Sequence, residues 1–591
     1  MVAIRTGRHA KARRPSTQAV SVGASIGVMT PPGFRGTYRD DVDACDVYSE
    51  AAGIARIIPR AIAVPVDIDD VVALAAWAQL TQTPLIPRGS GSSMSGAAIG
   101  DGVIVDLSRL ATVGPIDPET KRMWVGPGAV RDVVDAAAKA HGLWFPVDPS
   151  SGAWATIAGM VATNAAGPHT MKHGAMRHWV TALECVFDDG SRATIRRGGE
   201  LPTQAKSVAA IRRFSTQAMS TIFTTAMAEP IAKIRHAGVR KESSGYALVA
   251  FAKSGDLVDL FVGSEGTLAL IVGVELQLLD RPLGRTSLCA GFTTLEAAVT
   301  AAGRAAGLGA ATCELLDRTF LDVVRQGAPD VTVPPDVEAL LLLDAEAATQ
   351  GEANLLTDAI QAAFEALGAT GLTRASESHA IEQLWHIRHA ASPLLATMTD
   401  IGASMQFIED GAVPPPALPE YVRGIRAILE HHGFTGVIFG HAGDANVHVN
   451  PLVDVKKPDW RKHVEAALDE VVTLTAVLGG TLTGEHGDGR LRTPFQSRMW
   501  APDATVLFEL LKRCFDPRGI FNPGVKVPLP GQQALTDIKY DPALPPLSDA
   551  ARRALDFVSE TRAYASFRLD LLESQAIRSA GEPQTAKSEL P

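Results

Sequence analysis

Short apolar runs alternate with longer amphipathic stretches along the first half of the chain. The runs Thr83–Pro87 and Gly102–Leu107 have the length of strands, whereas Ile68–Gln79 and Val130–His141 carry apolar residues at helical spacing. This alternation predicts an α+β domain over residues 46–285. Residues 1–45 form a basic arm that we expect to be partly disordered, because residues 1–38 contain Lys and Arg but no Asp or Glu.

The pattern of the second half predicts another α+β unit over residues 286–480. Long Ala- and Leu-rich helical stretches enclose the strand-like run Ala339–Leu343, and a helix is expected over Trp460–Val477. Residues 481–530 form a further segment, and residues 531–591 form a C-terminal extension. Within the extension we expect one amphipathic helix over Ala550–Leu572 and a disordered end over Glu573–Pro591.

Histidine is concentrated in two short stretches of the second half. A strand, a Gly/Asp/Asn turn and an alternating strand surround His441 and His448, so a hairpin folded about Asp444–Ala445 would place these two imidazoles opposite each other, about 5 Å apart. Glu485 would complete a set of two His and one Glu for a divalent metal, with His486 beside it. The alternative for the first stretch is a polar hairpin with surface histidines.

Three glycine-rich stretches lie in the first half, at 88–96, 149–167 and 261–268. The first follows a strand, and its small residues allow consecutive backbone amides to form a nest for a pyrophosphate. It matches neither Gly-x-Gly-x-x-Gly nor a P-loop, so an NAD site of the Rossmann type is disfavoured. Together the three stretches predict a large planar cofactor that carries phosphates.

Composition narrows the class of protein. A chain of 591 residues with 46% hydrophobic and 20% charged residues is typical of a globular enzyme with several domains. The net charge of −10 argues against a nucleic-acid partner. The five cysteines are scattered and form no Cys-x-x-Cys, which argues against disulfides and iron–sulfur clusters, and no stretch could span a membrane. We therefore expect a cytoplasmic protein that could lie peripherally at the inner face of the membrane.

The order of these motifs resembles that of the FAD-linked 2-hydroxyacid dehydrogenases, which include D-lactate dehydrogenase, the glycolate oxidase flavin subunit and D-2-hydroxyglutarate dehydrogenase. The resemblance spans residues 45–530 and implies a two-subdomain FAD-binding domain of the vanillyl-alcohol-oxidase (PCMH) type. It also implies an α+β substrate domain with an antiparallel sheet, and a 481–530 segment that returns to the active site. The motifs that carry it are Arg88–Gly91, Pro149–Ser151, Ala155–Ile157, Ala162–Ala165, Ser243–Tyr246, Gly263–Leu268, Gly440–Asn450, Gly484–Gly487 and Phe521–Gly524.

The same resemblance implies a role for individual residues. His441, His448 and Glu485 would bind the metal, and His486 would be the catalytic base. Arg388 and Asn450 would bind the substrate, since the guanidinium of an Arg suits a carboxylate. The residues implied to bind FAD are Pro87, Arg88, Gly89, Ser90, Gly91, Ser92, Ser93, Gly96, Pro149, Ser150, Thr156, Gly159, Met160, Thr163, Asn164, Gly167, Gly174, Glu265, Gly266 and Asn522.

The implied reaction is oxidation of a D-2-hydroxy acid, D-lactate or glycolate, to the 2-oxo acid. The metal (Zn, alternatively Mn or Fe) would hold the substrate, and the hydride of C2 would pass to flavin N5. FAD would be non-covalent because Ser92 and Ser93 stand where relatives with covalent flavin carry His, and the absence of a Lys near Ile408–Asp410 disfavours a dicarboxylate.

Electrons would leave to a separate non-NAD acceptor: an iron–sulfur subunit, a quinone, a cytochrome or an electron-transfer flavoprotein. A homodimer is one assembly that the chain could form. Two alternatives stay open at this point. One is a flavin-free metal-dependent hydrolase, and the other is a non-catalytic flavin-binding subunit of a larger complex.

Overall fold

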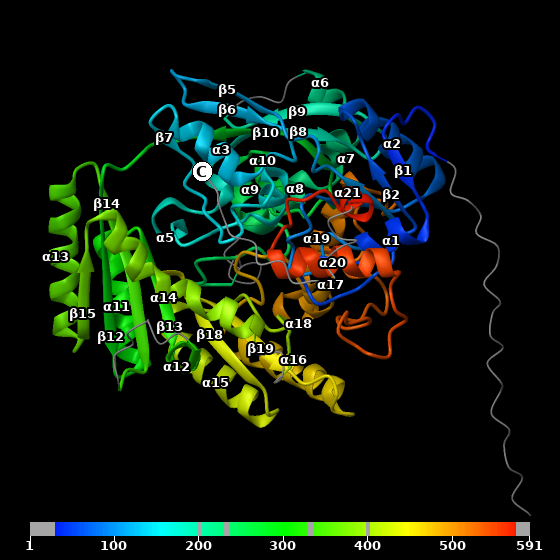
Figure 1. Ribbon diagram of the computed structural model, residues 1–591. Coiled ribbons are helices and arrows are strands. Elements are labelled where there is room, and N and C mark those ends of the chain that lie inside the picture. Colours follow the sequence, from blue (N-terminus) through cyan, green and yellow to red (C-terminus); the bar gives the residue numbers. More distant parts are fainter. Residues whose placement is uncertain (1–29, 199–202, 228–235, 328–335, 398–401, 575–591) are drawn as a thin grey trace, which may run out of the picture.

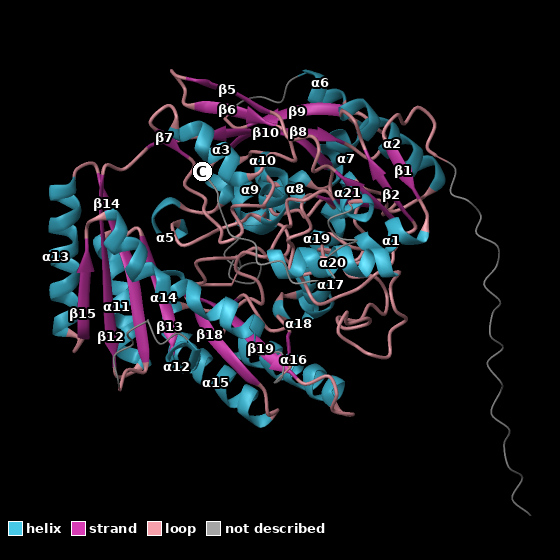
Figure 2. Cartoon of the chain, viewed as in Figure 1, coloured by secondary structure: helices cyan, strands magenta, loops and turns pink. Residues whose placement is uncertain are grey.

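The computed structural model describes residues 30–198, 203–227, 236–327, 336–397 and 402–574. The N-terminal half and the C-terminal segments form one part of the molecule, and an antiparallel sheet with its helices forms the other (Figure 1). Figure 2 shows the strands gathered into separate sheets with helices between and around them. Most of the predicted basic arm and of the predicted disordered C-terminal end lies outside the described residues.

The first sheet has four strands in the order β1-β2-β4-β3, and β4 runs parallel to both β2 and β3. Because side chains alternate along a strand, Ala61 and Ala63 of β2 pack toward α2 while Ile62 and Val64 pack toward α1. Both faces of the sheet are therefore buried. These elements are β1 (Thr37–Arg39), α1 (Val42–Tyr48), β2 (Ala61–Val64), α2 (Ile68–Thr81), β3 (Leu85–Arg88) and β4 (Val103–Asp106).

The second sheet has five antiparallel strands in the order β5-β6-β10-β8-β9, with the β7–β11 pair beside it. Its core packs against helices of the same half and against α19 from the C-terminal segment. The strands are β5 (Val113–Asp117), β6 (Arg122–Val125), β7 (Leu143–Trp144), β8 (Val180–Val186), β9 (Arg192–Arg196), β10 (Leu270–Gln277) and β11 (Leu279–Asp280). The helices are α3 (Arg131–Lys139), α4 (Ile157–Thr163), α5 (Thr170–His173), α6 (Thr203–Ser207), α7 (Ala209–Gln217), α8 (Met219–Met227), α9 (Leu248–Ser254) and α10 (Val258–Phe261).

The third sheet is antiparallel, in the order β15-β12-β14-β13-β18-β19-β16, with β17 also paired to β19. Helices α11, α13, α15 and α16 cover one face, and α12 and α14 cover the other. The strands are β12 (Gly284–Phe292), β13 (Thr312–Asp317), β14 (Ala339–Ala347), β15 (Thr370–Ala375), β16 (Ala403–Ser404), β17 (Gly411–Ala412), β18 (Thr435–His441) and β19 (Asn446–Val453). The helices are α11 (Leu295–Leu308), α12 (Arg318–Gly327), α13 (Gln350–Ala366), α14 (Ser378–Thr397), α15 (Leu418–His431) and α16 (Trp460–Val477).

The C-terminal residues return to the first half of the chain, as the red segments of Figure 1 show. The single helix expected over Ala550–Leu572 is wrong: two helices form, because Arg562 takes a left-handed conformation (φ 58°) and stops the first. Leu555 and Leu569 pack with Ile62 and Ile104 on the first sheet. The helices are α17 (Gly489–Arg492), α18 (Gln496–Met499), α19 (Pro502–Phe515), α20 (Asp549–Thr561) and α21 (Arg568–Glu573).

The predicted α+β class is confirmed by this architecture: a mixed α+β half is joined to a unit with an antiparallel sheet. All five cysteines are free, in agreement with their scattered spacing, and all five are buried. Among the described residues, no helix has the length and apolar composition that crossing a bilayer requires. The exact domain boundaries stay a prediction.

Candidate functional site

The histidine hairpin forms, but with a different register from the predicted one. His441 pairs with Asn446 and His448 pairs with Phe439, so the predicted pairing of His441 with His448 is wrong. The chain reverses one residue earlier than expected, since a 3-10 turn takes Ala442–Asp444. A shift of two positions leaves a side chain on the same face of a strand, so the two imidazoles still meet, with ring centroids 5.2 Å apart.

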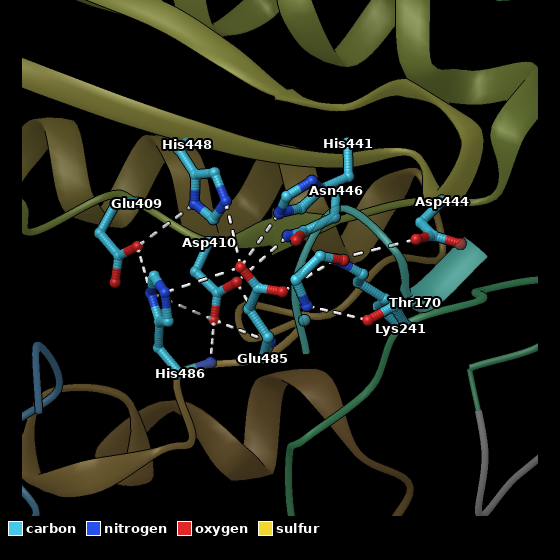
Figure 3. Close-up of polar contacts among 12 residues, drawn as sticks. Thr170, Lys241, Glu409, Asp410, His441, Asp444, Asn446, His448, Glu485 and His486 are labelled. Carbon is cyan, nitrogen blue, oxygen red and sulfur yellow. Dashed lines mark hydrogen bonds and ion pairs between the residues drawn. The ribbon is translucent and has the colours of Figure 1, made fainter. Parts of the chain in front are cut away.

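Three side chains predicted as metal ligands converge on one point. The Nε2 atoms of His441 and His448 each lie 3.2 Å from Oε1 of Glu485 (Figure 3). One ligand atom from each of the three lies within 4.8 Å of the others, and all three residues are buried. Two imidazoles and one carboxylate in this geometry form a donor set that suits a divalent transition metal.

Two carboxylates that the motifs did not reveal orient the imidazoles. Oε1 of Glu314 lies 2.5 Å from Nδ1 of His441, and Oε2 of Glu409 lies 2.6 Å from Nδ1 of His486 and 3.7 Å from Nδ1 of His448. A carboxylate at Nδ1 fixes the ring and leaves Nε2 directed at the centre of the site. Burial would raise the pKa of Glu314, but the neighbouring His441 and nearby cations lower that pKa to about 2.

His486, the predicted base, lies beside the ligand set, with Nε2 3.7 Å from Oε1 of Glu485. Burial would lower its pKa, but Glu409 and then Asp410 raise that pKa to about 10. The loop from Thr483 to His486 is held by Asp410, whose carboxylate accepts hydrogen bonds from the backbone amides of Glu485 and His486. It also accepts from the hydroxyl of Thr483, so one buried side chain fixes the whole turn.

A buried cation completes the set. Nζ of Lys241 lies 2.8 Å from Oε2 of Glu485 and 3.7 Å from Oδ2 of Asp444 (Figure 3). Lys241 therefore holds the carboxylate oxygen that does not face the imidazoles. A second cation, Arg388, donates to Glu314 over 3.1 Å and lies above the ring of Phe439.

A cavity of about 1380 Å³ joins this cluster to the glycine-rich loops of the first half. Arg388 and Asn450 line it together with the three metal-ligand candidates and His486. The FAD-site candidates that line it are Pro87, Arg88, Gly89, Ser90, Gly91, Ser92, Ser93, Pro149, Ser150, Thr156, Gly159, Met160, Thr163, Gly167, Glu265 and Gly266. The four that do not are Gly96, Asn164, Gly174 and Asn522.

Some of the FAD-site candidates have a structural contact that explains their identity. The guanidinium of Arg88 donates to the backbone carbonyls of Tyr48 and Glu50, so it ties the first glycine-rich stretch to the end of α1 and the residues after it. The carboxylate of Glu265 accepts from the amides of Asp488 and Gly489 and fixes the loop that follows His486. The amide of Asn522 donates to the carbonyls of Ala97 and Glu265. These three side chains position the loops around the cavity.

Sequence reasoning missed Glu314, Glu409 and Lys241. A carboxylate between the apolar residues Cys313 and Leu315 of strand β13 is the one feature that could have revealed Glu314. Glu409 and Lys241 follow no such pattern. The individual ligand, substrate and base assignments stay predictions.

Two family matches account for most of the described chain. Residues 59–196 match the family described as "FAD binding domain", and residues 281–525 match "FAD linked oxidases, C-terminal domain". The chain belongs to the FAD-linked oxidase family. Its FAD-binding half has the PCMH-type fold, as the resemblance implied.

Curated relatives share this family at 27–29% identity. Glycolate oxidase subunit GlcD of Bacillus subtilis (strain 168) is 28% identical over 81% of this chain and 91% of its own length. D-lactate dehydrogenase of Archaeoglobus fulgidus is 29% identical over 78% and 89%. D-2-hydroxyglutarate dehydrogenase of Pseudomonas putida is 27% identical over 86% of this chain but 52% of its own length, so the chain spans about half of that relative.

Solved structures support the fold alone. A 4-ethylphenol oxidase from Gulosibacter chungangensis aligns with a TM-score of 0.59 at 15% identity, covering 83% of this chain and 94% of that one. An alkyldihydroxyacetonephosphate synthase aligns with a TM-score of 0.56 at 14% identity, covering 82% and 83%.

Proposed function

We propose that this chain oxidises a small D-2-hydroxy acid to the 2-oxo acid, using non-covalent FAD and a divalent metal, and passes the electrons to a separate acceptor protein or quinone. One observation carries the proposal. The two imidazole Nε2 atoms and Glu485 converge within the same cavity that the glycine-rich loops line. The relatives named for glycolate and D-lactate chemistry support the substrate class.

The residues of the first half fit FAD. The cavity is large enough for a dinucleotide, and the five glycines of the first half that line it allow the backbone to approach a ligand closely. The hydroxyl of Ser93 is buried at this wall and has no hydrogen-bond partner among the described residues. A buried hydroxyl without a partner is costly, and a phosphate oxygen would satisfy it.

The donor set of the second half fits a divalent metal such as Zn²⁺, with Mn²⁺ or Fe²⁺ as alternatives. His441, His448 and Glu485 would hold it, and the carboxylates at Nδ1 of the two imidazoles would fix their orientation. When bound, FAD would supply the acceptor for the C2 hydride. A dication would polarise the substrate hydroxyl and lower the pKa of this hydroxyl and of neighbouring groups.

The remaining steps belong to side chains of this chain. Nε2 of His486 would accept the hydroxyl proton, while Nδ1 stays engaged with Glu409. Arg388 would bind the substrate carboxylate, because its Nε is held by Glu314 and the residue lines the cavity beside the histidine cluster. Asn450 would add a neutral contact at the same wall. The absence of Lys around Ile408–Asp410 favours D-lactate or glycolate over a dicarboxylate.

Anaerobic mixing of the FAD-loaded protein with D-lactate, glycolate, L-lactate and D-2-hydroxyglutarate tests the proposal. Bleaching of the flavin absorbance by D-lactate or glycolate is the expected result, and chelation of the metal should abolish it. His486→Ala should retain FAD and metal but slow bleaching by about 100- to 10,000-fold, the usual contribution of a general base. His141→Ala, at an exposed imidazole after α3, is the matched control.

Three results would overturn the proposal. A colourless protein that takes up no FAD would favour the metal-dependent hydrolase. A yellow protein that none of the acids bleaches would favour the non-catalytic flavin subunit. Unchanged bleaching in His486→Ala would remove that residue from its role as base.

A further inference from the structure

A second histidine cluster lies on the outer surface of the antiparallel unit, where α15 ends beside α16. His431 and His432 come at the end of α15, and His463 and Glu470 come from α16. None of these residues lines the large cavity. In Figure 1 the two helices lie side by side at the edge of this unit, and hydrogen bonds between their side chains join them.

The cluster repeats the geometry of the internal one. Nε2 of His432 and Nδ1 of His431 approach the same oxygen, Oε1 of Glu470, at 3.0 and 3.5 Å. Ligand atoms around one tetrahedral Zn²⁺ stand about 3.3 Å apart, because each lies about 2.0–2.1 Å from the ion. The two separations to Glu470 therefore already match those that a shared ion would require, and one ligand atom from each of the three residues lies within 4.8 Å of the others.

The hydrogen bonds behind His432 point to the same conclusion. Nδ1 of His432 lies 3.1 Å from Nδ1 of His463, and Nε2 of His463 lies 3.2 Å from Oδ2 of Asp459. If a metal takes the lone pair of Nε2 of His432, then Nδ1–H of that ring donates to His463, and Nε2–H of His463 donates to Asp459. Every nitrogen then has a matching partner while both rings are neutral.

Without a metal the same contacts are not all satisfied by neutral rings. If Nε2–H of His432 donates to Glu470, its Nδ1 must accept from Nδ1–H of His463. The second nitrogen of His463 then presents a lone pair to the carboxylate of Asp459, which is unfavourable unless an extra proton is bound. A carboxylate–histidine chain behind a liganding imidazole is the arrangement that orients metal ligands in proteins.

We propose that His431, His432 and Glu470 form a second site for a divalent transition ion such as Zn²⁺ or Ni²⁺, with His463 and Asp459 as its outer support. His432 is the buried member, with 5% of its side chain exposed, whereas 69% of the His431 side chain is exposed. Water would therefore complete the coordination. The ion would link the end of α15 to α16 on a face remote from the chemistry, and its role is structural.

Metal counting on the full chain without a polyhistidine tag tests this site. Zn²⁺ bound per chain is measured by elemental analysis after dialysis, in the Glu485→Gln background, which removes a ligand of the internal cluster. One equivalent should remain, and Glu470→Gln should remove it. Glu465→Gln, an exposed carboxylate on the same helix, should keep it. In the otherwise unchanged protein, Glu470→Gln should leave the rate of flavin bleaching as it was.

A second measurement separates a built site from a loose surface contact. His463→Ala removes no ligand but should weaken Zn²⁺ binding by about 10- to 100-fold, because it removes the outer support of His432. Retention of the equivalent in Glu470→Gln, or its absence in the Glu485→Gln background, would overturn the proposal. Unchanged affinity in His463→Ala would do the same for the hydrogen-bonded support.

Discussion

Replacement of Lys241 by Met removes the buried cation beneath the internal cluster and keeps the length of the side chain. At 2.8 Å from Glu485, the attraction between the two charges is about 6 kcal/mol at an effective dielectric constant of 20. Breaking a buried ion pair costs about 3–5 kcal/mol, because one charge stays buried without its partner. His441 still lies 3.2 Å from the same carboxylate, so we expect the lower end, about 3 kcal/mol.

The assay is thermal unfolding in the presence of a chelator and then with saturating Zn²⁺. A loss of about 3 kcal/mol lowers the midpoint of a unit of 150–250 residues by about 6–12 °C. With Zn²⁺ bound, the dication compensates Glu485 in place of the lysine, so the difference between Lys241→Met and the natural protein should shrink. Lys172→Met is the control, since this exposed lysine donates to a backbone carbonyl.

Two results would refute the reasoning separately. Equal midpoints in chelator would mean that the contact between Lys241 and Glu485 contributes little to stability. A difference that Zn²⁺ leaves unchanged would mean that no ion is bound beside Glu485, and this would count against the proposed metal role.

Three further predictions address other parts of the chain. Burial would lower the pKa of His169, but the carboxylates of Asp148 and then Glu346 raise that pKa well above its ordinary value. The free energy of unfolding of the natural protein should therefore exceed that of His169→Gln by its full amount below about pH 6.5, and this difference should decline as the pH rises. Thermal melts that differ equally at all pH values would contradict this. Gly266→Ala should weaken FAD binding about tenfold or more, because φ is +68° and the added Cβ would lie 2.3 Å from a proline ring. Gly303→Ala is the control, since its added Cβ meets nothing within 4 Å, and FAD titration compares the two variants. Leu555→Ala should lower the free energy of unfolding by about 3 kcal/mol, measured by denaturant unfolding. A loss below about 1 kcal/mol would contradict a buried position for Leu555 in the core.

Long periodic elements could be predicted from the sequence, because their pattern reflects burial directly. The helix expected over Trp460–Val477 forms with those bounds. The strand expected over Ala339–Leu343 continues to Ala347, since Asp344 looks like the end of a strand but is buried and held by Arg285. A polar residue ends an apolar run in the sequence but not in the fold when a distant cation satisfies it.

The residues of the candidate site also fall into those that the sequence predicts and those that it does not. His441, His448, Glu485 and His486 were found because they lie in short motifs whose spacing limits the possible geometry. The orienting carboxylate of Glu314 comes from a strand more than a hundred residues away, and only the pairing of β13 with β18 brings it to His441. The hairpin register could not be predicted, because the turn includes a residue in a left-handed conformation, which the local sequence leaves open.

Because α20 and α21 are synthesised last, they have a consequence for folding during synthesis. They cover one side of a sheet whose strands are all synthesised before residue 107. A ribosome must therefore add more than four hundred further residues before the part of this apolar face that α1 leaves uncovered is buried. During this interval the uncovered apolar residues are prone to aggregation, and a chain truncated before α20 would keep them exposed.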